Sequence, residues 1–344
     1  MTRAATAILT ALCLLALSAC DDGRVVQPAE LSTPQGLAHY LRDIPAVLTI
    51  EPWENPYAPG LTITTAHYVI HTTLTDPLML RQVPAFMESA YNAYQSQIAE
   101  PIDTQTPFVI YLFADRPQWD TFTRTFAAPN ADAYLRIVKG AYCRNGACVA
   151  YNIGRTRTFA ALGHEGWHQF NGKHFTYRLP SWLDEGIATL FEVSHYNHGA
   201  FEFLPRQNTE RLAALKAALQ RDPIPLRTLI TLDPGQVVHV PHAARDFYAQ
   251  SYALVRFLRE ADYGKRLKDY HNLLLAGLRG HWPLDPQLQQ IAADRNIPLT
   301  TTFNRGVSPA LFALYIDDDL DQVEAEYLGF CQKITDSITL AQEQ

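Results

Sequence analysis

The chain has 344 residues, of which 47% are hydrophobic, and it carries a formal net charge of −7 with a sequence pI of about 5.9. This apolar content is enough for a sizeable core and one or two domains. The acidic balance argues against a basic surface that neutralises phosphates, so nucleic acid is not an expected partner.

The N-terminal residues have the pattern of an export signal. An apolar run at 8–17, too short to span a membrane, ends in L-S-A-C at 17–20. This ending resembles the bacterial lipobox, in which the signal peptide is cut off and the cysteine, here Cys20, becomes lipidated. The resemblance implies a lipid-anchored protein of the bacterial cell envelope that faces the periplasm, and Asp21 and Asp22 favour the inner membrane. An ordinary secretory signal ending near Ala19 is the alternative.

Four regions follow from the distribution of prolines and apolar residues. We expect a signal peptide at 1–19, a proline-rich tether with one short helix at 20–60, a mixed N-terminal subdomain at 61–192 and a helical C-terminal subdomain at 193–344. The fold class is therefore α+β. The predicted elements, in chain order, are a β-rich stretch at 61–72, a helix at 77–99, a strand at 106–113, a helix at 115–126, a hairpin at 134–153, and helices at 158–170, 209–220, 243–260, 265–278 and 318–334.

The hairpin contains two of the five cysteines. C-R-N-G-A-C at 143–148 centres on Asn145-Gly146, a pair typical of two-residue hairpin turns. This turn would place Cys143 opposite Cys148, and facing cysteines on adjacent strands can meet disulfide distances. Because export implies an oxidising compartment, we predict a disulfide between them. Two free thiols on an edge strand, or a metal clip, are the alternatives.

The predicted helix after the hairpin carries H-E-x-x-H, with His164, Glu165 and His168. Histidines four residues apart lie on one face of a helix and can bind one metal ion together. Glu165 then stands where a general base can reach the attacking water. Two imidazoles and a carboxylate favour Zn²⁺. Because Glu165 acts on the water, the metal needs a third protein ligand from elsewhere in the chain.

His174 is one candidate for the third ligand. H-E-x-x-H followed by five residues and a histidine resembles the metzincin proteases, whose pattern has a glycine three residues after the second histidine. Asn171 holds that place here, and Gly172 follows it. Metzincins also place a methionine turn after the motif. The three methionines of this chain all precede it, so that turn cannot form.

Glu185, in L-P-S-W-L-D-E-G at 179–186, is the other candidate. Ser181 and Asp184 have the spacing of a capping box, which predicts a helix that carries Glu185 in its first turns. W-L-D-E-G resembles the W-L-N-E-G of gluzincin peptidases related to aminopeptidase N, in which the glutamate is the third zinc ligand. The resemblance implies that Glu185 completes the site, and that Glu192 orients a ligand histidine from outside it.

A tyrosine further along extends this resemblance. Aminopeptidase N relatives have Y-x-x-G-A at the start of a helix, and their tyrosine donates to the oxyanion of the tetrahedral intermediate. Y-A-Q-S-Y at 248–252 matches this with Tyr248, although Ser251 replaces the glycine. Tyr252, one turn later, is the second candidate for the role. A core tyrosine on an amphipathic helix is the alternative interpretation.

The layout as a whole resembles the peptidase MA-like gluzincins. The resemblance implies a zincin-like mixed sheet and a zinc metallopeptidase acting on peptide or protein substrates. The G-x-M-E-N stretch that holds a free amine in the aminopeptidases is missing, so aminopeptidase specificity is not expected. The strand at 148–153 is expected to pair with an extended substrate. A catalytically silent, zinc-stabilised binding or scaffold lipoprotein is the alternative function, and a zinc hydrolase with a non-peptide substrate is a third.

Overall fold

A computed structural model describes residues 30–137, 140–237, 242–295 and 300–338 of the chain. It has the α+β class that the sequence predicts, with a mixed sheet followed by a helical region. The predicted signal peptide and Cys20 lie outside the described residues.

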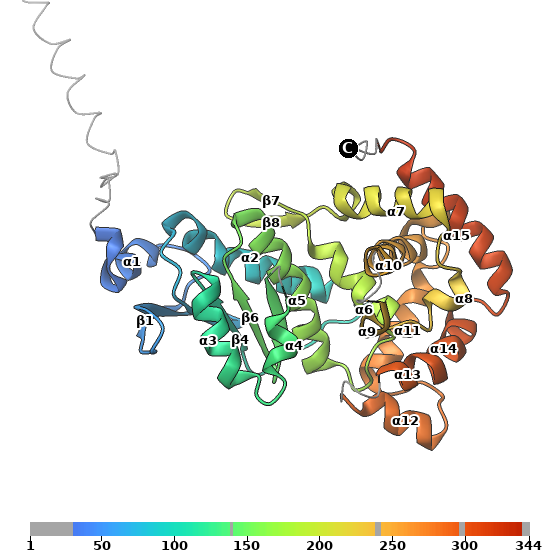
Figure 1. Ribbon diagram of the computed structural model, residues 1–344, viewed down its shortest axis with the longest axis horizontal. Helices are drawn as coiled ribbons and strands as arrows, with labels where there is room; N and C mark the ends of the chain where they lie inside the picture. Colours follow the sequence, from blue (N-terminus) through green and yellow to red (C-terminus); the bar gives the residue numbers. More distant parts are fainter. Residues whose placement is uncertain (1–29, 138–139, 238–241, 296–299, 339–344) are drawn as a thin grey trace, which may run out of the picture.

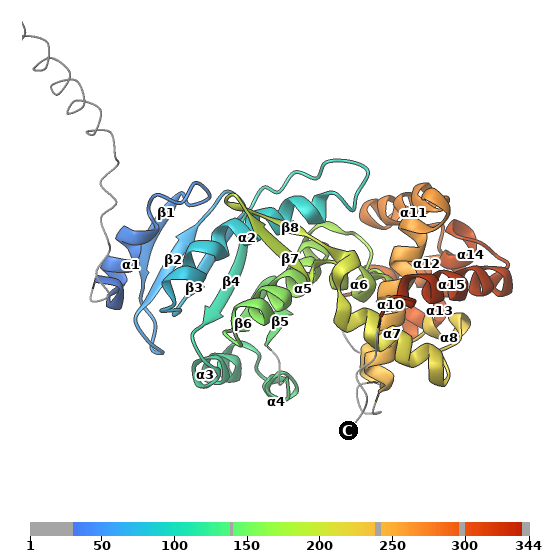
Figure 2. The same cartoon turned by 90° about the horizontal axis from the view of Figure 1, so that it is seen from above.

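The molecule is elongated, with a sheet-containing half and a helical half (Figures 1 and 2). In the first half, helices cover both faces of one sheet. Its six strands are β1 (Thr49–Trp53), β2 (Gly60–Thr64), β3 (Tyr68–Thr72), β4 (Phe108–Phe113), β5 (Ala141–Arg144) and β6 (Ala147–Tyr151).

The strand order in this sheet is β1-β2-β3-β4-β6-β5. The β3–β4 and β4–β6 pairs are parallel, and the other pairs are antiparallel. Strand β5 therefore lies at one edge, next to β6. This corrects the expectation that 148–153 pairs with a substrate, because β6 already has a neighbour on each side.

Helices of the first half lie on opposite faces of the sheet because the side chains of each strand alternate between faces. In β4, Ile110 and Leu112 join the main core, whereas Phe113 joins a smaller aromatic cluster on the other face. Helices α2 (Pro77–Gln95) and α5 (Arg155–His174) cover the main core, and α3 (Arg116–Phe126) and α4 (Ala131–Leu135) lie on the other side (Figure 2).

The helical half is arranged around α10 (Ala243–Glu260), which packs against α6 (Ser181–Ala188). The hairpin of β7 (Ser194–Asn197) and β8 (Ala200–Phe203), which the sequence did not predict, packs on α2. The other elements are η1 (Glu30–Ser32), α1 (Pro34–Leu41), η2 (Thr189–Phe191), η3 (Pro205–Gln207), α7 (Thr209–Arg221), α8 (Leu226–Leu229), α9 (Pro234–Val237), η4 (Ala261–Tyr263), α11 (Leu267–Arg279), α12 (Pro286–Ala293), α13 (Thr300–Gly306), α14 (Ser308–Tyr315) and α15 (Leu320–Thr335).

The predicted tether at 20–60 is wrong from residue 30 onwards. Leu37 and Leu41 of α1 are buried in the main core, and β1 is hydrogen-bonded to β2 as part of the sheet. The fold therefore includes the chain from Glu30 onwards, because the prolines interrupt strands and turns without preventing their packing.

The predicted register of the cysteine hairpin is confirmed, but the disulfide is not formed. Cys143 pairs with Cys148 across β5 and β6, and Asn145 and Gly146 both have positive φ as the turn requires. Both cysteines are free thiols. The Sγ of Cys143 donates instead to the backbone oxygen of Glu165 at 2.8 Å, and burial raises the pKa of this thiol, which keeps it protonated.

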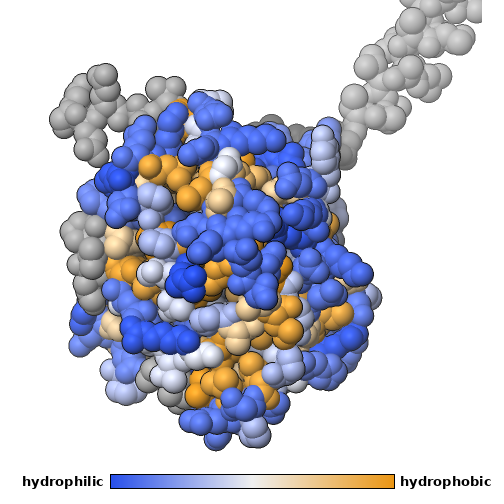
Figure 3. All heavy atoms as spheres, turned by 90° about the vertical axis from the view of Figure 1, so that its right-hand side faces the viewer, coloured by the Kyte–Doolittle hydropathy of each residue, from blue (hydrophilic) through white to orange (hydrophobic). Residues whose placement is uncertain are grey.

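The outer end of the helical half has a mixed surface, with apolar groups separated by polar side chains (Figure 3). Tyr263 and Leu314 are the large hydrophobic side chains of the described helical half that are exposed. Exposed side chains scattered in this way are ordinary on protein surfaces. Within the described ranges, no helix has the length and apolarity needed to cross a membrane.

Helix α5 approaches the chain after α6 closely at Gly163. A Cβ at Gly163 would lie 2.3 Å from the backbone oxygen of Phe191, whereas one at Gly172 of the same helix would meet no atom within 4 Å. We therefore expect Gly163→Ala to lower the free energy of unfolding by roughly 1–3 kcal/mol. Gly172→Ala should raise it by up to about 1 kcal/mol. Urea unfolding of both variants measures this, and equal effects would contradict the close approach.

Candidate metal centre

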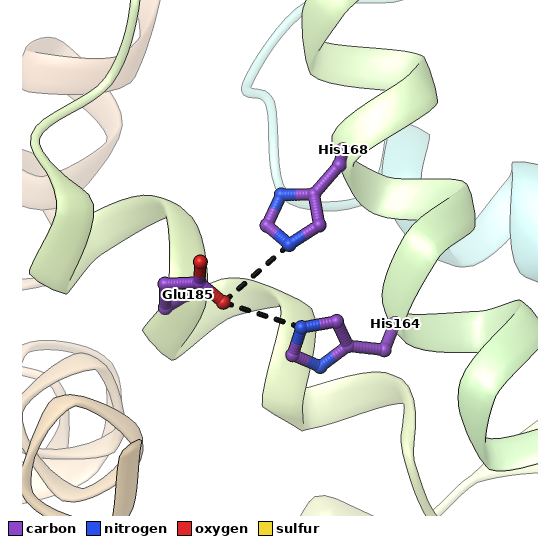
Figure 4. A group of neighbouring side chains, drawn as sticks. All are labelled: His164, His168 and Glu185. Carbon is purple, nitrogen blue, oxygen red and sulfur yellow. Dashed lines mark hydrogen bonds and ion pairs between the residues drawn. The ribbon is translucent and has the colours of Figure 1, made fainter. Parts of the chain in front are cut away.

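Helix α5 presents His164 and His168 on the face that looks toward α6 (Figure 4). The two rings lie 5.0 Å apart, centroid to centroid, because residues four apart are one turn apart. The opposite side of α5 is fixed in the main core by Phe159, Leu162 and Phe170. The burial of that apolar side determines which way the histidines point.

Glu185 of α6 meets both histidines (Figure 4). Its Oε2 lies 3.2 Å from Nε2 of His164 and 3.4 Å from Nε2 of His168. One potential ligand atom from each of the three residues lies within 4.8 Å of the others. All three side chains are at least four-fifths buried. Two imidazole nitrogens and a carboxylate oxygen at this separation suit a zinc ion, so the donor set fits the metal that the sequence predicts.

The other ring nitrogen of each histidine faces a second carboxylate. Glu192 Oε1 lies 3.1 Å from Nδ1 of His164, in the position that the resemblance implied. Asp184 Oδ1 lies 3.2 Å from Nδ1 of His168. A carboxylate on Nδ1 holds that nitrogen as the N–H donor and leaves Nε2 free to bind a metal.

The orienting role of Asp184 replaces the capping box predicted for it. Pro180 occupies the N-cap of α6, and no side chain caps that end. Asp184 instead accepts hydrogen bonds from Nε1 of Trp167 at 2.9 Å and Nδ2 of Asn171 at 3.0 Å. Together with Nδ1 of His168, these groups give three donors from α5 that fix the Asp184 carboxylate. The sequence signal was an acid beside Glu185 in W-L-D-E-G, where the resembling family has asparagine.

The charges of the site reinforce one another. Burial opposes the charged form of His164, but hydrogen bonds with Glu185 and Glu192 outweigh burial and raise the pKa of His164 to about 9. Burial likewise opposes a charged Glu185, yet the two histidines hold the pKa of Glu185 well below its usual range. Because a metal ligand must be a neutral imidazole, zinc binding at this site must release protons.

His174 does not belong to the site. The sequence predicted a helix that ends at Phe170, but α5 continues past Asn171 to His174. Six residues rotate a helix by about 240° beyond a full turn, so His174 points away from His168. Its Nε2 lies 3.0 Å from Oγ1 of Thr104, and burial lowers the pKa of His174 to about 4.

Arg211, on α7, joins the site although sequence analysis did not identify it. Its guanidinium binds the carboxylate of Glu192 through Nη2 at 2.6 Å and Nε at 2.9 Å. The same guanidinium carbon lies 5.2 Å from the ring centroid of Tyr248, and that ring lies 6.2 Å from the ring of His164. An arginine in the first turn of a surface helix carries no sequence signal for this role.

The two candidate tyrosines have different surroundings. Tyr248 lines a cleft of about 430 Å³ that also contains Glu165, and burial raises its pKa well above the usual value, so its hydroxyl stays a donor. The hydroxyl of Tyr252 is already used: it donates to the backbone oxygen of Pro205 at 2.6 Å and accepts from Arg256 at 2.8 Å. Only Tyr248 of this pair faces the cleft.

The general-base candidate Glu165 lines the cleft beside His164. Burial raises the pKa of Glu165, and the two nearby imidazoles oppose this rise. A raised pKa suits a carboxylate that must accept a proton and later release it.

Comparison with known proteins gives one match. A family model described as "Protein of unknown function (DUF1570)" matches residues 158–273, about a third of the chain. The matched segment runs from α5 to α11 and so includes the two histidines, Glu185, Arg211 and Tyr248. No curated protein and no solved structure matches the chain.

Proposed function

We propose that this protein is a zinc-dependent peptidase in which His164, His168 and Glu185 hold the metal. The observation that carries the proposal is the convergence of two Nε2 atoms on one Oε2, each with its Nδ1 held by a further carboxylate. A zinc ion held there would act as a Lewis acid toward the peptide carbonyl and would lower the pKa of the attacking water.

The residues around the site account for the proton transfers of peptide hydrolysis. Glu165 takes a proton from the water as the water oxygen attacks the carbonyl carbon. Tyr248 donates a hydrogen bond to the carbonyl oxygen as that oxygen gains charge. Glu165 then passes its proton to the leaving nitrogen as the C–N bond breaks. Arg211 and Glu192 hold Tyr248 and His164 in place.

Strand β5 supports a peptide as the substrate. It is an edge strand whose outer side no other described strand pairs with, and its Ala141 lines the cleft. Tyr151 donates to Gly140 at 3.1 Å, so alternation along the β5–β6 ladder turns the backbone groups of Ala141 and Cys143 outward. An extended peptide can hydrogen-bond to such an edge.

We also propose a lipid anchor at Cys20. It is supported by the L-S-A-C sequence at 17–20. Figure 1 shows that the described chain begins at the end of the molecule opposite the helical half.

Metal content tests the ligand set. We expect about one zinc per chain in the wild type and in His174→Ala, and loss of zinc in Glu185→Gln, because this change removes the carboxylate charge that both imidazoles face. Elemental analysis of chains that begin after Cys20 measures this. Loss of zinc in His174→Ala, with zinc retained in Glu185→Gln, would show that His174 and not Glu185 is the third ligand.

Glu165→Gln tests the reaction itself. The glutamine keeps the size of the side chain but cannot accept the proton, so cleavage of unfolded casein should fall by about 10²–10⁴-fold while zinc content is unchanged. Unchanged cleavage would remove Glu165 from the mechanism. A wild type that binds zinc and cleaves nothing would favour the binding or scaffold function instead.

Tyr248→Phe and Tyr252→Phe form a matched pair. The first removes a hydroxyl that faces the cleft, and the second removes one that is satisfied within the protein. We expect kcat to fall by about 10²–10³-fold in Tyr248→Phe. Tyr252→Phe should leave kcat near the wild-type value and lower only stability, by about 1 kcal/mol. Steady-state kinetics and thermal unfolding of both variants separate these effects.

A further inference from the structure

The cleft continues beyond the candidate metal centre along one face of α5. Arg157, Ala160, Ala161 and His164 all line it, and their spacing of three, four and seven residues places them in one row on the helix. The two alanines have small side chains, so they leave the cleft open between the metal centre and Arg157. The first turn of α7, with Glu210, forms part of the opposite wall.

The side chain of Arg157 is exposed, and within the described ranges it makes no ion pair. The other arginine of the cleft, Arg211, is already bound in bidentate fashion by Glu192. Glu210 faces the cleft from the opposite wall but forms no ion pair with Arg157. Arg157 is therefore the cleft cation that remains available to a ligand.

Two contacts fix the direction of β5 relative to α5. The Sγ of Cys143 donates to the backbone oxygen of Glu165, and Nε2 of Gln169 donates to the backbone oxygen of Gly146 at 2.8 Å. Strand β5 and helix α5 thus run in the same direction along the cleft. A peptide added antiparallel to β5 runs the opposite way, so the part after the cleaved bond extends toward Arg157.

The distance from the metal centre to Arg157 corresponds to a defined number of substrate residues. Seven helical residues from His164 to Arg157 span about 10 Å along the axis. An extended peptide advances about 3.3 Å per residue. A substrate side chain near Arg157 therefore belongs to about the third residue after the cleaved bond. In a substrate that ends at the second residue, the C-terminal carboxylate would lie there instead.

We propose that Arg157 is a specificity-determining residue that selects peptides with a carboxylate two or three residues after the cleaved bond. The carboxylate is either an Asp or Glu side chain or the C-terminal carboxylate of a short leaving fragment. This inference rests on the proposed peptidase function for its register. It concerns a binding preference, which can be measured without turnover.

The binding test uses Glu165→Gln, the variant designed to prevent cleavage. Fluorescein-labelled eight-residue peptides, identical except for one glutamate or glutamine and ending in an amide, are compared by fluorescence anisotropy. The glutamate peptides should bind about fivefold to tenfold more tightly, as for a partly exposed charge-assisted hydrogen bond. The double variant with Arg157→Gln should lose this difference. The matched control with Arg155→Gln, an exposed arginine that does not line the cleft, should keep it.

The cleavage test locates the carboxylate. A mixed peptide library is digested by the wild type, and the cleaved bonds are mapped by mass spectrometry. We expect Asp and Glu to be enriched at the third position after the bond, or free C-termini to be enriched at the second. Amidating the C-termini distinguishes these two sources, because it abolishes only the second enrichment.

The outcomes separate this inference from the proposed function. Equal binding of glutamate and glutamine peptides overturns the role of Arg157, even if the wild type is an active peptidase. A preference for lysine at the third position, lost in Glu210→Gln, overturns it as well and assigns the selectivity to the opposite wall. An inactive wild type that still binds the carboxylate peptides more tightly contradicts the peptidase and leaves the role of Arg157 supported.

Discussion

The close packing of α5, α6 and α10 is the constraint on which the candidate site depends. Gly163 of α5 lies against the backbone oxygen of Phe191, and a Cβ at Gly186 of α6 would lie 2.5 Å from the backbone oxygen of Ser251 in α10. A side chain at either glycine would separate the helices. Because these contacts hold α6 next to α5, Glu185 reaches both imidazoles.

The site is held together by paired charges that tolerate a change of cation. Two protonated imidazoles and a zinc ion with two neutral imidazoles carry the same total charge. The carboxylates of Asp184, Glu185 and Glu192 favour either arrangement. Buried charges need partners, and the bidentate contact of Arg211 with Glu192 supplies one at the back of the site. A metal ion bound here would therefore compete with protons for one preformed cluster.

Both halves of the molecule contribute to the cleft. The sheet half supplies α5 with its histidines and Glu165, and it supplies the edge strand β5. The helical half supplies Arg211 from α7 and Tyr248 from α10. The groups proposed to bind metal and move protons thus come mainly from one half, whereas the hydroxyl proposed for the carbonyl oxygen comes from the other. The proposed catalysis would require that the halves keep their relative positions.

The sequence by itself determined the features that depend on local spacing: the pairing of Cys143 with Cys148 around a positive-φ turn, and the shared face of His164 and His168. The likeness of W-L-D-E-G to a known motif identified Glu185. Only the tertiary structure decided which strand lies at the sheet edge and which tyrosine faces the cleft. It also decided that the carboxylate of Asp184 contacts Nδ1 of His168 and that Arg211 binds the carboxylate of Glu192. Helical periodicity and turn chemistry are read within a few residues, whereas strand order and helix packing depend on burial summed over segments far apart in the chain.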